Sequence, residues 1–403
     1  MIRLASVRNA VSGIMLSRSA AAMTRIERGR SAMHDMTMSG AKAIIDSLSE
    51  GIYVCDLDRT ITYWSQSAEQ ITGWSAAEVI GRQCHDSVLC HVDKDGHLLC
   101  GEEYCPLHRA MVTGTRSRGS LLVYAQKKGG RRVPVEVSVA PIRDKAGTVI
   151  GGVETFRDAT GIVHDLERAK AIQRFALQYE LPADDRVTFT THYVPHDIIG
   201  GDYFAIERLD ADRYGIMLAD VMGHGIAAAL YTMHLSQLWD RFHTALVDPV
   251  EFTSTVNNAL AKVLKSDVSF ATAVCGLVDV KNRVFRFVGA GGPMVLLMHA
   301  DGSREVLKNP GLPLGILVDA PYEEIGANLR EGDRLLLFSD GAVEVANAAG
   351  EMVGLDGLVV LLQELGYPGT ELRMDALEEA LLRFSNAIRL PDDLTFIEVR
   401  MSG

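Results

Sequence analysis

Carboxylates recur where apolar segments meet loops in the second half of this 403-residue chain. They are Asp202, Asp220, Asp340 and the adjacent pair Asp392 and Asp393. Each one alone is explained by a turn, because Asp and Gly are common turn residues. Several carboxylates at one end of a sheet, however, repel one another unless cations neutralise them. Oxygen ligands suit hard ions such as Mg²⁺ or Mn²⁺, so turns and a two-cation site are both open interpretations.

The segment "LADVMGHGIAAAL", residues 218–230, shows this pattern in its sharpest form. An apolar strand ends in Asp220, and burial of that carboxylate is costly unless something compensates its charge. The glycines that follow let the backbone turn tightly and approach an ion, and the carbonyl beside Asp220 is a further candidate ligand. For His224, between two glycines, a solvent-facing loop position is favoured over a positioning role near phosphate.

The elements that must position these acids lie in residues 183–403, a length sufficient for one large core. Strands are predicted at 187–194, 203–208, 213–219, 270–279, 283–288, 294–299, 304–307, 333–339 and 394–400. Helices are predicted at 225–243, 249–265, 355–365 and 370–388. Many strands with helices grouped in pairs favour an α+β sandwich over a regularly alternating parallel sheet.

Six segments of this region resemble, in order, the PPM-type protein serine/threonine phosphatases, and most closely the sporulation stage II E and stress-response branch of bacteria. They are "GGDYF", "ADVMGHGIAAAL", "GAGGP", "PLGI", "LLLFSDGAVE" and "PDDLTFIEVR". The resemblance covers about residues 173–400. It implies an α-β-β-α sandwich with two metal ions, usually Mn²⁺ or Mg²⁺, at one end.

The resemblance also implies roles for individual residues. The implied metal ligands are Asp220, the Val221 carbonyl, Asp340, Asp392 and Asp202, the last directly or through a bound water. Asp220 would bridge the two ions and, with Asp202, serve catalysis, while Asp393 and Gly341 would support the site. The implied reaction is hydrolysis of phosphoserine or phosphothreonine by a metal-activated water, without a covalent phosphoenzyme.

Some positions depart from the family pattern. Ala205 stands where "GGDYFD" often ends in an acid, and residues 289–292 lack the Asn and His of the usual "NAGH". Neither departure removes an implied metal ligand, so activity is expected with altered substrate docking. Cys275 lies in a predicted strand without a phosphate-cradling loop after it, which favours core packing over a thiolate-phosphatase role.

Residues 42–160 contain short strands around one helical segment. The stretches "GIYVCDLDRTITYWSQSAEQITGWSAAEVIGR" and "GGVETFRDAT" predict a hairpin, a short helix from Ser65 to Ile71 and later strands. They resemble a PAS domain, a small sensor fold with a five-stranded sheet. The resemblance leaves the sensed ligand open.

Four cysteines lie in one insertion of this region, residues 84–108, with four histidines among them. They are Cys84, Cys90, Cys100 and Cys105, and no pair has Cys-x2-Cys spacing. Thiolates with imidazoles suit Zn²⁺ or an iron–sulfur cluster. A reversible thiol switch and ordinary loop cysteines are the alternatives, and Cys55 is assigned to the core.

A helical linker and an N-terminal extension complete the chain. Residues 161–182 carry an apolar stripe and end at Pro182, which predicts a helix. The stripe consists of Ile162, Leu166, Ala169, Ile172, Phe175, Ala176 and Tyr179. It would pack on the following domain or on a second copy, or the helix is a plain connector. For the basic residues 1–41, a flexible extension is favoured over a transit-like or surface-binding helix.

The net charge and the lengths of the apolar runs limit the classes of function that the chain can have. A net charge of −12 argues against a nucleic-acid surface, and no apolar run approaches the roughly 20 residues that span a bilayer, so we expect a cytoplasmic protein. We interpret the chain as a PAS sensor, a helical transmitter and a metal-dependent phosphatase, and we expect a homodimer through PAS and linker. The resemblance suggests an anti-sigma-factor antagonist as substrate. The alternatives are a phosphatase-like scaffold and a PAS redox or metal sensor.

Overall fold

The computed structural model describes residues 44–402, apart from positions 87, 102–103, 118, 178–179, 224, 264–269, 293, 309 and 388. The predicted extension 1–41 and His224 therefore lie outside the described residues. The chain divides into two compact units, one ending at Gly161 and one beginning at Ile162. Within the described part of the chain, no helix has both the length and the apolar character needed to cross a membrane.

The first unit is built on one antiparallel sheet with strand order β2-β1-β5-β4-β3. Its strands are β1 Gly51–Cys55, β2 Ile61–Trp64, β3 Leu121–Gln126, β4 Arg132–Arg143 and β5 Val149–Asp158. Its helices are α3 Gln66–Thr72, α4 Ala76–Val79 and α5 Pro106–Thr113. Every second residue of β4 from Val133 to Val139 is buried, so one face of the sheet forms the core of this unit.

Helix α5 was not expected from the sequence, because it begins inside the cysteine-rich insertion. Cys105 is its N-cap, and the Cys105 sulfur accepts a hydrogen bond from the His108 backbone N–H at 3.5 Å. Pro106 then occupies the first turn, where its missing N–H costs nothing. The last cysteine of the insertion is thereby fixed at a helix start that packs on β4 and β5.

The second unit is a sandwich of two antiparallel sheets, ordered β13-β10-β9-β8-β7 and β12-β11-β14-β15-β6. The first sheet contains β7 Asp202–Arg208, β8 Arg213–Val221, β9 Ala271–Asp279, β10 Val284–Ala290 and β13 Ile325–Asn328. The second contains β6 Val187–Val194, β11 Val295–Met298, β12 Arg304–Leu307, β14 Arg334–Phe338 and β15 Leu394–Met401. The helices are α7 Ile226–Phe242, α8 Pro249–Val263, α9 Gly354–Glu364 and α10 Met374–Ser385, with short 3₁₀ turns η1 His243–Val247 and η2 Asp340–Ala342.

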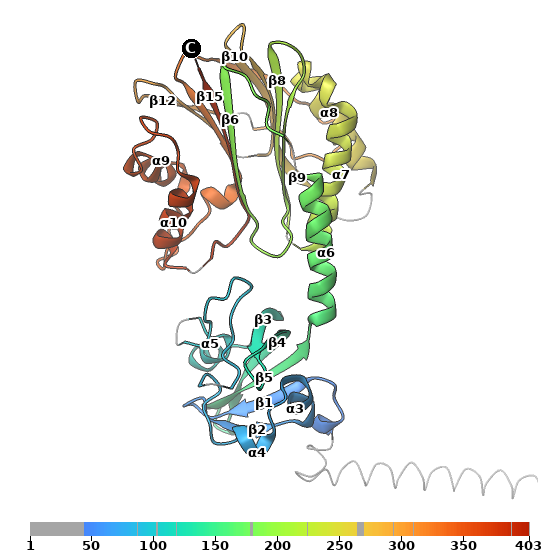
Figure 1. The fold of residues 1–403 in the computed structure, drawn as a ribbon, viewed down its shortest axis with the longest axis vertical. Helices are drawn as coiled ribbons and strands as arrows, with labels where there is room; N and C mark the ends of the chain where they lie inside the picture. The colour runs from blue at the N-terminus through green and yellow to red at the C-terminus, as the bar shows by residue number, and fades with distance from the viewer. Residues whose placement is uncertain are drawn as a thin grey trace, which may run out of the picture. The chain divides into compact units, whose positions relative to one another are not determined.

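Figure 1 shows the two sheets of the sandwich between the helix pair α7 and α8 and the helix pair α9 and α10. Three apolar layers hold these elements together. One fills the space between the two sheets, including Ile216 and Ile397. A second joins the first sheet to α7 and α8 around Trp239, and a third joins the second sheet to α9 and α10 around Phe396. Strand β13 is the one strand of this unit that the sequence did not predict, because "IGAN" shows no alternation of apolar and polar residues.

Helix α6, Thr160–Ala176, is the predicted linker helix. Its buried residue is the polar Gln173, whereas the largest described residues of the predicted apolar stripe are exposed. Tyr179 of the stripe lies outside the described residues. Ile162, Ile172 and Phe175 are 48%, 60% and 82% exposed. The helix thus packs on the second unit through the face that carries Gln173, Ala176 and Leu177. Of these three, Ala176 belongs to the predicted stripe.

Candidate functional site

The predicted acids lie at corresponding ends of the two sheets of the sandwich. Asp202 opens β7 and is paired in register with Asp220, near the end of the neighbouring strand β8. Asp340 opens the 3₁₀ turn that follows β14, and Asp392 and Asp393 precede β15. Strand pairing therefore brings together acids that are up to 191 positions apart in the sequence, as Asp393 accepts a hydrogen bond from the Asp202 N–H.

Asp202 is the most deeply placed of these acids. It is 1% exposed, and its Oδ2 accepts a hydrogen bond from the Thr395 hydroxyl of the facing sheet. Its Oδ1 is buried without a hydrogen-bond partner. Because an unpaired buried oxygen is costly, a missing partner is expected at this atom.

The pKa values of Asp220 and Asp202 also indicate that these acids need a cation. Burial, followed by the neighbouring Asp202 and Asp340, raises the pKa of Asp220 far above the ordinary range of a carboxyl. Burial and the charge of Asp393 raise the pKa of Asp202 as well. Among the described residues, no lysine or arginine forms an ion pair with any of these acids. The charged forms of Asp202 and Asp220 are therefore costly unless a cation compensates them.

Asp393 differs from the others because backbone N–H groups compensate it. Its Oδ1 accepts from the His196 N–H at 2.6 Å, and its Oδ2 accepts from the N–H groups of Gly201 and Asp202. It thereby fixes the loop that presents Asp202. Burial nevertheless raises the pKa of Asp393. The contacts fit the supporting role expected for this residue.

Glycines allow the close approach of these loops. A Cβ on Gly341 would overlap the Asp393 carbonyl oxygen, and one on Gly200 would lie 2.7 Å from Asp393 Oδ2. A Cβ on Gly201 would lie 3.1 Å from the carbonyl oxygen of Val221, the predicted backbone ligand. The glycines are thus required by packing around Asp393 and Val221.

The carboxylate set fits hard divalent cations. All its donors are oxygen atoms, one of them is an orphaned buried carboxylate oxygen, and the carboxyl pKa values rise when no cation is present. Asp392 is exposed and Asp220 half-buried, so the group reaches solvent on one side. The assignment of individual ligands stays a prediction.

Comparison with known proteins shows which families the two domains resemble. The family model for the stage II sporulation protein E matches residues 210–402, and a PAS-fold model matches residues 45–163. Residues 210–402 are thus similar to the stage II sporulation protein E family. The chain is an α+β protein with a PAS domain and a PP2C-type phosphatase fold, which confirms the predicted fold class and both resemblances.

Two curated relatives from Bacillus subtilis are similar to this chain. One is the phosphoserine phosphatase RsbP, 30% identical over 183 residues, which are 45% of each protein. The other is the phosphoserine phosphatase RsbU, 26% identical over 240 residues, which are 59% of this chain and 70% of RsbU. The chain thus spans less than half the length of RsbP. Among solved structures, the SiaA-PP2C domain of Pseudomonas aeruginosa aligns with a TM-score of 0.52 at 24% identity, covering 60% of this chain and 98% of that domain.

Sequence reasoning missed a contact between the linker helix and the acid site of the PP2C-type domain. The Gln173 amide on α6 donates to the Gly200 carbonyl at 2.7 Å and to the Thr232 hydroxyl at 2.9 Å. Its carbonyl oxygen accepts from the Gly200 N–H at 3.3 Å. Gly200 belongs to the same loop as Asp202, so the helix is hydrogen-bonded to the loop that carries a predicted ligand. A polar residue beside an apolar stripe was the available signal.

The PAS domain buries a second group that the sequence pointed to only in part. Glu154, on the core face of β5, is 1% exposed, and its pKa is raised to about 8 by burial. His91, 4% exposed, has its pKa lowered to about 4 by burial and by Arg132. Neither residue was named as a site residue from the sequence. Glu154 was findable, since it lies on the apolar phase of its strand, whereas nothing in the spacing distinguished His91 from the other three histidines of the insertion.

The predicted cysteines fall into two classes around this pair. Glu154 contributes to raising the pKa of Cys84, Cys100 and Cys105, although burial is the larger cause in each case. The Cys90 thiol instead lies against the His85 carbonyl, 3.3 Å away. All four are free thiols. A sensor site formed by all four stays a prediction. Cys275 lies in the core of the PP2C-type domain, as expected.

Proposed function

We propose that this chain is a metal-dependent protein phosphatase that hydrolyses phosphoserine or phosphothreonine on a partner protein. The observation that carries the proposal is the placement of Asp220 beside Asp202 and Asp340, with the Oδ1 of Asp202 buried and without a hydrogen-bond partner. Such a group is costly for a scaffold but useful for holding cations. The names of RsbP and RsbU as phosphoserine phosphatases support the same reaction.

The surroundings of each residue suggest whether it would bind metal or support the site. Asp220 and Asp340, with Asp202 behind them, would hold two Mn²⁺ or Mg²⁺ ions, and Asp392 would hold the second ion from the solvent side. When bound, the ions supply an activated water and stabilise the charge that develops on phosphate during in-line attack. Asp393 and the glycines around it keep the Asp202 loop in place. The partly open side of the group is where phosphate would enter.

The decisive test is hydrolysis of a small phosphate ester by the full chain, with Mn²⁺ and with a chelator. In Asp220→Asn we expect the metal-dependent rate to fall by at least about a hundredfold, because the central ligand charge is lost. Asp356→Asn, an exposed acid on α9, is the matched control and should keep the rate. Calorimetry should show two Mn²⁺ equivalents in the wild type. Turnover that survives in Asp220→Asn would contradict the proposal.

Regulation through α6 is the second part of the proposal. Gln173 links the helix that leaves the PAS domain to the loop of Asp202, so a change in the helix could alter metal binding. The phosphoprotein substrate would be an anti-sigma-factor antagonist or a similar partner-switching protein. This substrate class rests on the family resemblance and needs its own test with phosphorylated candidates.

The exposed apolar stripe of α6 supports a homodimer through the linker. Phe175 and Ile172 are three positions apart, so they lie side by side on the helix, and they stay 82% and 60% exposed. We expect light scattering to show a dimer for the full chain and a shift toward monomer in Phe175→Asp. Lys170→Asp, a charge change on the same helix, is the control. A monomeric wild-type chain at micromolar concentration would contradict the proposed homodimer.

A further inference from the structure

The core of the PAS domain contains two polar atoms that face each other without hydrogen bonds. His91 Nε2 and Glu154 Oε1 lie 3.6 Å apart, and both are buried without a partner. This distance is too long for a good hydrogen bond. Buried polar atoms are normally satisfied, and each exception calls for an explanation such as a missing ion.

The surroundings of the pair are the side chains that soft or borderline metals prefer. Cys84 and Cys105 are 3% and 5% exposed, and Glu154 acts electrostatically on both, as it does on Cys100. Cys100 is tied to His91 directly, since its sulfur accepts the His91 N–H at 3.0 Å. An imidazole, a carboxylate and thiols therefore share one dry region of the domain.

Local structure holds these groups from several elements at once. The Tyr53 hydroxyl on β1 donates to Glu154 Oε2 at 3.2 Å, which leaves Oε1 as the free oxygen. His91 and Cys100 lie on the two arms of a loop closed by the Leu99 N–H and the His91 carbonyl at 2.9 Å. A hydrogen bond from a neighbouring group that orients a ligand is typical of metal sites in proteins.

We propose that His91 Nε2 and Glu154 Oε1 bind a divalent transition-metal ion of the zinc class, with two of the three thiolates of Cys84, Cys100 and Cys105 completing a tetrahedral coordination. For Zn–N and Zn–O bonds of usual length, a tetrahedral arrangement separates the two ligand atoms by roughly 3.4 Å, close to the 3.6 Å observed. Among the described residues, no sulfur yet lies within 4.8 Å of both atoms. The thiol side chains must therefore turn toward the ion.

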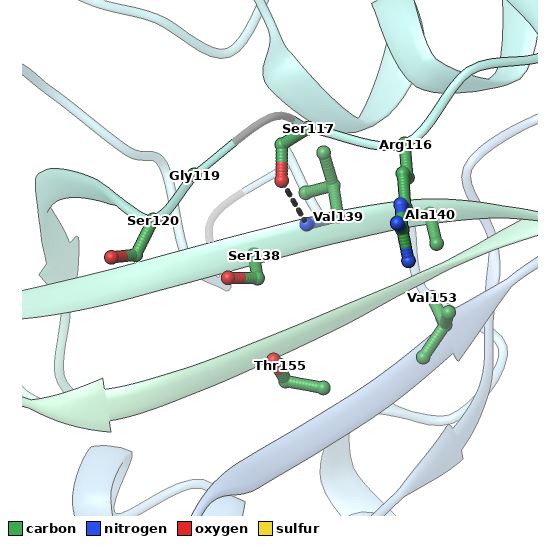
Figure 2. Close-up of a pocket in the computed structure, with 9 residues that line it drawn as sticks. All are labelled: Arg116, Ser117, Gly119, Ser120, Ser138, Val139, Ala140, Val153 and Thr155. Atoms are coloured by element: carbon green, nitrogen blue, oxygen red, sulfur yellow. Dashed lines mark hydrogen bonds between the residues drawn. The ribbon is translucent and has the colours of Figure 1, made fainter.

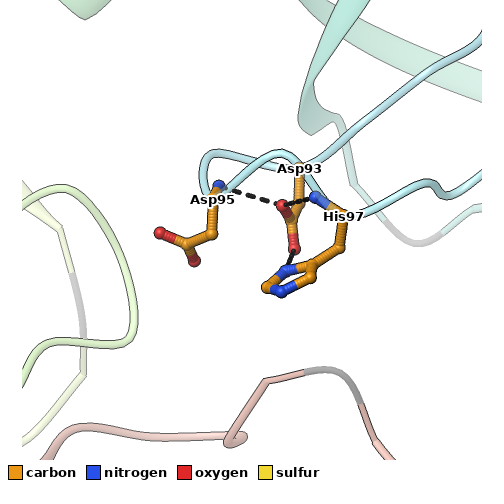
Figure 3. A group of neighbouring side chains, drawn as sticks. All are labelled: Asp93, Asp95 and His97. Carbon is orange, nitrogen blue, oxygen red and sulfur yellow. Dashed lines mark hydrogen bonds and ion pairs between the residues drawn. The ribbon is translucent and has the colours of Figure 1, made fainter.

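Two other features of the domain are less suited to a ligand. Asp93, Asp95 and His97 form a close group in the same loop (Figure 3). The Asp93 carboxylate there accepts from the N–H groups of Asp95 and His97 at 2.9 Å, which closes a turn. The role of the group is thus to shape the loop that carries His91 and Cys100.

The second feature is an open groove on the opposite face of the sheet (Figure 2). Val153 and Thr155 line it, whereas Glu154 between them on β5 points into the core, because side chains alternate along a strand. The groove and the proposed metal site are therefore separate. A ligand in the groove would not contact His91.

The test is cobalt substitution in the full chain after removal of metal with a chelator. A thiolate-bound Co²⁺ gives a near-ultraviolet sulfur-to-cobalt charge-transfer band, which an oxygen-only site in the PP2C-type domain cannot give. We expect one equivalent of Co²⁺ to produce this band and Zn²⁺ to remove it. A full chain that binds Co²⁺ without the band would overturn the proposal.

Variants identify the ligands. Glu154→Gln keeps the shape and the Tyr53 contact but loses the charge, and we expect Co²⁺ affinity to fall at least about tenfold; His91→Asn should do the same. Cys90→Ser, whose thiol donates to the His85 carbonyl, is the matched control and should keep affinity and band. Circular dichroism and melting of the metal-free variants separate ligand loss from misfolding. An unchanged affinity in folded Glu154→Gln and His91→Asn would refute the assignment.

Discussion

The two domains each bury carboxylates that lack sufficient partners, but they surround them with different chemistry. In the PP2C-type domain, the neighbours of Asp202 and Asp220 are other carboxylates at the ends of two sheets. In the PAS domain, the neighbours of Glu154 are an imidazole, a phenol and thiols. The first set favours hard ions bound by oxygen, and the second favours zinc-class ions.

The acids of the PP2C-type domain and the His91–Glu154 pair of the PAS domain also differ in solvent exposure. Asp220 is half-buried and Asp392 exposed, so ions and substrate can reach the acids from solvent. Glu154 and His91 are almost completely buried. An ion held by the first group can take part in turnover, whereas an ion held by the second would mainly tie β5 to the cysteine-rich loop. The comparison therefore separates a catalytic role from a structural or sensory one.

The largest effect that would sharpen this comparison is expected from Asp393→Ala. Asp393 is the acid compensated by backbone N–H groups, and its loss leaves those of His196, Gly201 and Asp202 without their acceptor. We expect the free energy of unfolding to fall by about 3 kcal/mol and the phosphatase rate to fall with it. Chemical denaturation and the ester assay measure the two effects.

The matched variant is Asp392→Asn at the neighbouring, exposed position. It should lower Mn²⁺ affinity with little change in the free energy of unfolding, because Asp392 is on the solvent side. Equal effects of the two substitutions on stability would show that the two acids do not divide support from metal binding in this way.

A smaller effect is expected when the linker helix is uncoupled from the Asp202 loop. Gln173→Ala removes three hydrogen bonds to Gly200 and Thr232, at a cost of about 1–2 kcal/mol in the free energy of unfolding. We expect the Mn²⁺ concentration for half-maximal rate to rise several-fold, with a smaller change in KM for the ester. Arg174→Ala, on the exposed side of the same turn, is the control. A metal dependence equal to wild type in Gln173→Ala would remove the structural basis for regulation through α6.

The sequence predicted most strands and helices of the PP2C-type domain because its buried elements are long and periodic. The strand before Asp220, for example, was predicted at 213–219 and runs over Arg213–Val221. Asp202 and Asp220 stood out because a carboxylate at the end of an apolar strand needs an explanation. What the sequence could not supply was the pairing of β7 with β8, and of Asp393 with the Gly201 N–H, since these contacts depend on long-range packing.

The sensor site was only partly predictable for a physical reason. Spacing marked the four cysteines, but it could not tell that Cys90 turns away to the His85 carbonyl. Glu154 is an acid on the buried phase of a strand, flanked by Gly152 and Phe156 on that face. That signal was present in "GGVETF" and was not used. The face of α6 that packs was also missed, because apolar spacing identifies a stripe but not its partner.

The smallest predicted effect is on the pH dependence of stability, and it concerns Asp184, whose charge is compensated by an arginine of the same chain. Hydrogen bonds from Arg186 and Tyr214 hold the pKa of Asp184 well below its usual range. Because the folded state then binds fewer protons than the unfolded state, this pair stabilises the fold above the ordinary Asp pKa, and the contribution is lost as the pH falls. Unlike Asp202, Asp184 needs no added ion.

Raised-pKa acids such as Asp202 and Asp220 act in the opposite sense in both proteins, so the readout is the difference in melting temperature between metal-free wild type and Arg186→Gln. We expect this difference to shrink as the pH falls from about 5 to about 3. The difference should stay below about 3 °C, since Arg186 is partly exposed and water screens the pair. Arg304→Gln, which breaks the ion pair with the exposed Asp356, should show the wild-type pH dependence. If the melting temperatures of Arg186→Gln and wild type change in parallel as the pH falls, Arg186 does not compensate the charge of Asp184. Asp184 would then no longer serve as the example of an acid that needs no added ion.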